Sequence, residues 1–132
     1  MTALPLTTLA TVLTILVLAG FGTMVSRARY RHNVIAPAVT GHPVFERWYR
    51  VQMNTTEQII MLLPLMWLTS AWLGDKWGAL SGLVWCLGRL VYARAYARDP
   101  ENRAIGFYIG AVPVGVMFVA VIVAVILNWV RA

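Results

Sequence analysis

Two runs of polar side chains interrupt segments of the chain that are otherwise apolar. The first run has spacings of three, four and three residues and consists of Arg47, Arg50, Asn54 and Glu57. The second has spacings of three and four and consists of Arg89, Tyr92 and Tyr96. Residues three or four apart share one face of a helix, so each run predicts a polar stripe on an apolar helix. A charge deep in lipid costs roughly 2.5–3.5 kcal/mol, so the stripes should face protein, water or a polar ligand.

The stripes carry a surplus of positive charge, which limits the chemistry they could perform. The arginines at one predicted depth are Arg47, Arg50, Arg89 and Arg103, and the nearby carboxylates are Glu46, Glu57 and Glu101. A guanidinium group forms paired hydrogen bonds with a carboxylate, and amide and phenol groups stand beside it here. The pattern favours binding of an anion with carboxylates and amides at the membrane interface. A structural ion-pair network, with Glu57 paired to Arg50 or Arg89, is the alternative.

Composition indicates which elements hold these residues. Of the 132 residues, 60% are hydrophobic and 12% charged, whereas about a quarter of a soluble domain is charged. We therefore expect an all-α membrane protein with one domain over residues 1–132. The uncharged stretches, extended through the two polar stripes, predict a bundle of four transmembrane helices, with spans at Ala3–Val25, Pro43–Gly74, Trp77–Tyr96 and Ala104–Val130.

The basic residues predict the orientation and exclude some partners. Loops 26–43 and 98–103 hold most of the charge between spans, so they are expected in the cytoplasm, with both termini on the opposite side. The net charge of +6 lies beside apolar spans, which favours contact with membrane lipids and not with nucleic acid. One cysteine and two histidines provide no metal-ligand spacing, so no metal is expected. Cys86 is expected to pack among apolar neighbours.

The two polar stretches resemble a known family. "FERWYRVQMNTTE" (45–57) and "GRLVYARAYARDPENR" (88–103) are similar to the membrane-associated proteins in eicosanoid and glutathione metabolism, the MAPEG family. The likeness extends from about Ser26 to Tyr108. It implies a homotrimer of four-helix subunits that binds glutathione between neighbouring subunits, on the cytoplasmic half of the membrane.

The resemblance also implies roles for single residues. Those implied to bind glutathione are Arg29, Arg50, Gln52, Asn54, Glu57, Arg89, Tyr92 and Tyr96. Arg103 matches the arginine that holds the glutathione thiolate. In leukotriene-forming members an arginine stands at the position of Tyr30 and a tyrosine at that of Gln58. These two departures argue against leukotriene synthesis and leave the glutathione residues in place.

The function expected from the resemblance is that of a membrane glutathione S-transferase, with glutathione as co-substrate and a hydrophobic electrophile or lipid as second substrate. Peroxide reduction is a natural extension, because a thiolate also attacks peroxide oxygen. Two alternatives remain open. One is a non-catalytic lipid-binding scaffold of the same family. The other is a small four-span transporter with Glu57 as its ionisable site. Glu57 could also be a structural counter-ion, and Tyr92 and Tyr96 could be interfacial aromatic residues.

Overall fold

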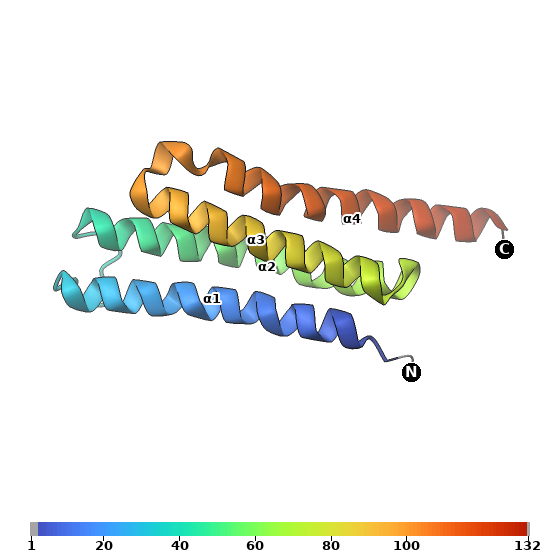
Figure 1. Cartoon of the computed structure of the whole chain (residues 1–132), viewed down its shortest axis with the longest axis horizontal. Helices are drawn as coiled ribbons and strands as arrows, with labels where there is room; N and C mark the ends of the chain where they lie inside the picture. The colour runs from blue at the N-terminus through green and yellow to red at the C-terminus, as the bar shows by residue number, and fades with distance from the viewer. Residues whose placement is uncertain (1–2, 132) are drawn as a thin grey trace.

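The described residues form four long helices, each antiparallel to the next along the chain (Figure 1). The computed structural model describes residues 3–131, so residues 1, 2 and 132 of the expected domain lie outside the described range. The elements are α1 (Pro5–Arg31), α2 (Pro43–Leu73), α3 (Asp75–Arg98), the short 3-10 helix η1 (Pro100–Arg103) and α4 (Ala104–Arg131). The described residues contain no strand, which confirms the expected all-α class.

Helix α1 is longer than the uncharged stretch that predicted it. We expected a loop from residue 26, but the helix continues to Arg31 and the loop covers residues 32–42. The segment from Ser26 to Arg31 has no glycine or proline to end a helix. Its last turn carries Arg29 and Arg31, which the negative end of the helix dipole favours. Charge therefore marked the predicted end of the apolar span and not the end of the helix.

Helices α2 and α3 form the middle of the bundle. Helix α1 packs against both of them, and α4 packs against both from the other side (Figure 1). Fully buried apolar side chains fill the space between the helices, among them Leu62 and Met66 of α2, Trp85 of α3 and Met117 of α4. Polar residues on α2 and α3 can therefore face α1, α4 or each other, which the sequence pattern could not decide.

The outer surface of the bundle is apolar on every helix. Leu9, Ile60, Leu87 and Val116, one from each α-helix, are between 60% and 68% exposed. Apolar surface this extensive is typical of a protein surrounded by lipid. By length and hydropathy alone, two helices qualify as membrane spans, at Pro5–Arg31 and Pro100–Arg131. Helices α2 and α3 carry the polar stripes.

A closed polar cluster joins the helices at the termini-side end of the bundle. The Asp75 carboxylate accepts hydrogen bonds from the backbone N–H of Leu6 at 2.9 Å and of Thr7 at 2.8 Å. The Thr7 hydroxyl lies 2.7 Å from Asp75 Oδ1 and 2.5 Å from Ser70 Oγ. Asp75 thus caps the first turn of α1 from another helix, where a negative charge is favoured. Partial burial raises the pKa of Asp75, but the bonds from Thr7 and Leu6 outweigh it and lower the pKa overall.

Glycines allow α3 and α4 to cross with their backbones in near contact. A Cβ on Gly106 would overlap the backbone nitrogen of Tyr92, and one on Gly88 would lie 2.5 Å from that of Gly110. Small residues four apart permit this close packing between membrane helices. The crossing fixes the start of α4 against Tyr92, close to the polar stripe of α2.

Candidate functional site

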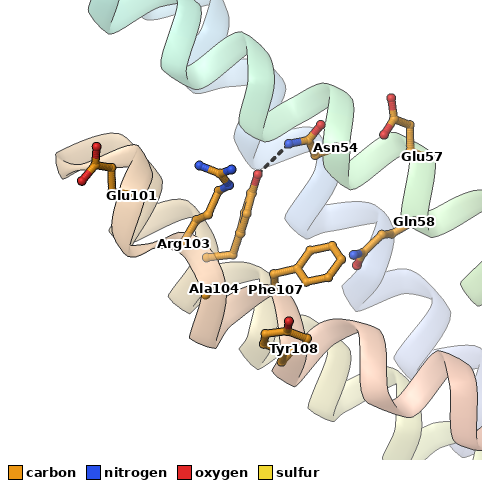
Figure 2. Close-up of a pocket in the computed structure, with 9 residues that line it drawn as sticks. Asn54, Glu57, Gln58, Glu101, Arg103, Ala104, Phe107 and Tyr108 are labelled. Carbon is orange, nitrogen blue, oxygen red and sulfur yellow. Dashed lines mark hydrogen bonds between the residues drawn. The ribbon is translucent and has the colours of Figure 1, made fainter.

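A cavity of about 650 Å³ opens at the end of the bundle opposite the Thr7–Asp75 cluster. Its walls come from α2, α3, η1 and the first turns of α4, and most of them are drawn in Figure 2. The lining residues are Asn54, Glu57, Gln58, Tyr92, Glu101, Arg103, Ala104, Phe107 and Tyr108. This volume is within the usual range for small-molecule sites, roughly 300–1,000 Å³.

Arg103 is held by the turn that precedes α4. Asp99 caps η1 by accepting a hydrogen bond from the N–H of Glu101 at 3.1 Å. Arg103 Nη1 donates to the carbonyl oxygen of Pro100 at 2.7 Å, and its guanidinium carbon lies 5.9 Å from the ring centre of Tyr96. The side chain remains exposed and points toward α2 in Figure 2. Its other N–H groups can therefore bind a ligand in the cavity.

Tyr92 and Asn54 form the polar inner wall. Asn54 Nδ2 donates to the Tyr92 hydroxyl at 2.6 Å, which joins α2 to α3 (Figure 2). Tyr92 is otherwise buried, with its ring 5.5 Å from that of Tyr96. The Tyr92 hydroxyl can still donate a hydrogen bond, and the Asn54 carbonyl can accept one. This pair offers a ligand one donor and one acceptor at fixed positions.

Arg89 is fully buried behind this wall and does not line the cavity. Its Nε and Nη2 donate to Thr55 Oγ1 at 3.1 and 2.8 Å, and its guanidinium carbon lies 3.9 Å from the ring centre of Tyr92. Its Nη1 has no hydrogen-bond partner among the described residues. In this position Arg89 orients Tyr92 through cation–π contact.

Arg47 also has a structural position. It donates to the carbonyl oxygens of Ala97 and Arg98, at 3.3 and 3.0 Å. The hydrogen-bond partners of Arg47 and Arg89 are thus backbone carbonyls and a threonine, not carboxylates. Of the two pairings in the ion-pair alternative, Glu57 with Arg50 or with Arg89, the second is not formed in the described residues, because the Arg89 guanidinium donates to Thr55. The expected surplus of arginines at the site is reduced to Arg103 within one chain.

Three further residues implied by the family resemblance lie away from the cavity. Arg29 donates to the carbonyl oxygens of Val34 and Ala38, at 3.2 and 2.9 Å, and holds the loop after α1. Gln52 faces α1, because a Cβ on Gly22 would lie 3.3 Å from Gln52 Nε2. Arg50 is exposed on α2 and is not among the lining residues.

One chain therefore brings together only some of the residues that the resemblance implies for binding glutathione. Asn54, Glu57, Tyr92 and Arg103 line the cavity, and the ring of Tyr96 lies next to that of Tyr92. Glu57 stands at the rim with its side chain exposed, where it can pair with a cation of a ligand. The transporter alternative uses Glu57 as its ionisable site, and within one chain this side chain is exposed.

The sequence pattern missed the residues that α4 and Gln58 contribute. Phe107 and Tyr108 form an exposed apolar wall one turn after Arg103. Helical spacing from Arg103 could have indicated them. Gln58 is buried and its Oε1 accepts a hydrogen bond from Trp85 Nε1 at 3.0 Å. Within residues 3–131, no group of three His, Cys, Asp or Glu side chains could hold a metal ion.

Known proteins share this sequence across most of its length. The chain is 36% identical over 121 residues to "Uncharacterized protein sll1147" of Synechocystis sp. (strain ATCC 27184 / PCC 6803 / Kazusa), covering 92% of this chain and 85% of that protein. It is 39% identical over 101 residues to leukotriene C4 synthase of Cavia porcellus, covering 76% and 67%. It is 33% identical over 87 residues to microsomal glutathione S-transferase 2 of Homo sapiens, covering 66% and 59%.

The match to a protein family covers at least part of every α-helix and all the residues that line the cavity. The model of the MAPEG family matches residues 7–123, a range that holds the two polar stripes and Arg103. The two named relatives match over 101 and 87 residues of this chain. The chain belongs to the MAPEG family of membrane proteins.

Proposed function

We propose that this protein is a membrane glutathione S-transferase that activates glutathione as a thiolate for attack on hydrophobic electrophiles. The observation that carries the proposal is the composition of the cavity. Arg103 and the Asn54–Tyr92 pair offer polar contacts, while Phe107 and Tyr108 offer an apolar wall beside them. A charged tripeptide and an apolar substrate can meet at such a boundary. The name of the relative microsomal glutathione S-transferase 2 supports the same activity.

The proposed chemistry depends on the thiol of glutathione and needs no protein nucleophile. A free thiol has a pKa of about 8.5. Lowering it by about two units requires roughly 2.7 kcal/mol of preferential thiolate stabilisation. Arg103 can supply this because a guanidinium remains protonated, and an apolar substrate against Phe107 and Tyr108 would exclude water from around it. The thiolate then forms the new S–C bond, the leaving group departs with its electron pair, and the thiol proton goes to solvent.

Glutathione offers groups that match the remaining walls. Its ammonium group would pair with Glu57 at the rim, and its amides with Asn54 and the Tyr92 hydroxyl. Arg89 would act through Tyr92, as a positioning residue. The same thiolate would reduce a lipid peroxide, with a second glutathione completing the reduction to disulfide, alcohol and water.

Three residues implied to bind glutathione lie away from the cavity, and their positions support a site shared between subunits. Arg29 and Gln52 lie on the α1 side of α2, while the cavity opens on the α4 side. In a homotrimer, the face of α1 that carries Gly22 and Arg29 can complete the cavity of a neighbouring subunit, and Arg50 on the exposed face of α2 can contribute there too. The loops 32–42 and 99–103 share one end of the bundle (Figure 1). The arginines at this end favour the cytoplasmic side for it.

The activity is tested by conjugation of glutathione to 1-chloro-2,4-dinitrobenzene, with purified protein in detergent. We expect turnover by the wild type and loss of it in Arg103→Ala, with glutathione binding retained. Arg98→Ala is the matched control, because the Arg98 side chain is exposed close to the same turn and lines no wall of the cavity. Wild-type protein that binds lipophiles but neither conjugates nor ionises glutathione would instead support a non-catalytic scaffold.

A further inference from the structure

A second hollow surface follows α1, away from the candidate site. Its polar half, of about 510 Å³, is lined by Met24, Arg27, Ala28, Tyr30, Arg31, His32, Val44 and Trp48. Its apolar half, of about 380 Å³, is lined by Leu13, Leu16, Val17, Gly20, Phe21, Met24, Trp48 and Leu90. The two halves share Met24 and Trp48, so they form one continuous surface, named here the α1 groove. Among the described residues, no carboxylate lines either half.

The charge in the polar half is not used by the fold. Of the three arginines at the end of α1, Arg29 is occupied by the carbonyl oxygens of Val34 and Ala38. Arg27 and Arg31 are exposed and line the groove. His32 stacks on His42 with ring centres 3.6 Å apart. Burial, then the neighbouring His42 and Arg31, lower the pKa of His32, and the two arginines carry the positive charge of this half.

The apolar half has the length of one membrane leaflet. Leu13 and Met24 bound it along α1, and eleven residues of helix rise by about 16 Å. Half of a hydrocarbon core of about 30 Å is about 15 Å. The arginines follow directly, at the level where lipid headgroups lie. A groove with a leaflet-long apolar half and a basic end has the shape and charge of a lipid site.

We propose that the α1 groove binds an anionic phospholipid of the surrounding leaflet. The lipid phosphate lies between Arg27 and Arg31, and one acyl chain follows α1 from Met24 toward Leu13, against Trp48 and Leu90. The site is separate from the glutathione cavity and does not depend on the function proposed for that cavity.

The acidic residues of the chain argue against a second copy as the occupant. The chain has five Asp and Glu residues. Three are already engaged within their own chain: Glu46 accepts from the N–H of Gly41, Asp75 caps α1, and Asp99 caps η1. The other two, Glu57 and Glu101, line the glutathione cavity. A neighbouring copy therefore has little negative charge to place against Arg27 and Arg31, whereas a phospholipid phosphate matches them.

Native mass spectrometry of the detergent-solubilised full chain tests the proposal, with dioleoyl phosphatidylglycerol and dioleoyl phosphatidylcholine as probes. We expect the wild type to retain phosphatidylglycerol about tenfold better, an advantage set by two arginines near the headgroup. The Arg27→Gln/Arg31→Gln variant should lose this preference. Both side chains are exposed, so the variant should fold. Equal retention of the two lipids by the wild type would overturn the proposal, as would an unchanged preference in the variant.

A steric test addresses the acyl chain. A Cβ at Gly20 meets nothing within 4 Å and Gly20 lines the apolar half, so the side chain of Gly20→Leu should occupy part of the groove. We expect lower retention of both lipids. Gly115→Leu is the matched control, because Gly115 is equally open and lies on α4. A Gly20→Leu variant that retains lipid but changes its oligomeric mass would contradict the proposal and assign the groove to a second copy.

Discussion

The Thr7–Asp75 cluster and the cavity lie at opposite ends of the bundle and differ in how completely their polar groups are paired. At the termini-side end, the Thr7 hydroxyl and the Asp75 carboxylate are bonded to each other and to backbone groups within the chain. At the cavity end, Arg103 donates to one carbonyl oxygen, and the rest of its side chain is exposed at the cavity. Complete pairing stabilises the fold, whereas incomplete pairing leaves groups for a ligand. Substitutions at the two ends should therefore affect different measurements.

The largest effect is expected for Arg103→Ala, on chemistry and not on stability. Losing about two pKa units of thiolate stabilisation lowers the ionised fraction of bound glutathione at pH ~6.5 about fiftyfold. The conjugation rate should fall by a similar factor, while the melting temperature in detergent stays unchanged, because Arg103 is exposed. Arg103→Lys should recover some of the rate. A conjugation rate in Arg103→Ala equal to that of Arg98→Ala would show that Arg103 does not stabilise the thiolate.

Thr7→Val is expected to lower the stability of the protein and to leave the conjugation rate unchanged. Thr7 is fully buried, and valine cannot replace its hydrogen bonds to Asp75 and Ser70. The free energy of unfolding should fall by about 1–3 kcal/mol. The conjugation rate at a temperature well below melting should be unaffected, since the cavity lies at the other end. Unfolding by sodium dodecyl sulfate measures the stability. A lost rate in folded Thr7→Val would show that the two ends are coupled.

A smaller effect is expected for Tyr92→Phe, which removes one hydrogen-bonding group from the inner wall. Asn54 Nδ2 loses its acceptor, and glutathione loses a donor. One such bond is worth about 1 kcal/mol, so the glutathione dissociation constant should rise about fivefold. Isothermal titration calorimetry measures this change. Tyr49→Phe is the control, because Tyr49 lines no wall of the cavity. The same dissociation constant for Tyr92→Phe and wild type would place glutathione elsewhere.

The smallest effect is expected from low pH, which should lower the melting temperature by protonating Asp75 in the Thr7–Asp75 cluster. The folded-state pKa of Asp75 lies below its ordinary value of 3.8. The stabilisation from its bonds is therefore present above that value and is lost as the pH falls through the lowered pKa. Melting temperature should decline below about pH 4. Asp75→Asn should be less stable near neutral pH and should decline less in acid. Parallel pH profiles for the two proteins would show that Asp75 does not contribute.

The sequence predicted the four helices and which residues share one face of a helix. It did not predict which neighbouring helix each face packs against. Hydropathy placed α2 and α4 almost to the residue, and spacing placed Asn54 and Glu57 on one wall. The same spacing placed Arg89 there, yet its side chain turns behind Tyr92 to reach Thr55. The Asp75 cap is 68 residues from Thr7 along the chain, so no local pattern indicates it. The contact of Gly106 with Tyr92, which fixes the Phe107 wall, likewise depends on tertiary packing.

The most direct test is the ultraviolet difference spectrum of the purified protein titrated with glutathione, because it detects thiolate without any second substrate. The wild type should show a saturable thiolate absorbance at pH ~6.5, where free glutathione, with a thiol pKa of about 8.5, is only about 1% ionised. Arg103→Ala should bind glutathione without that absorbance. Glutathione bound by the wild type wholly as the neutral thiol would contradict the account.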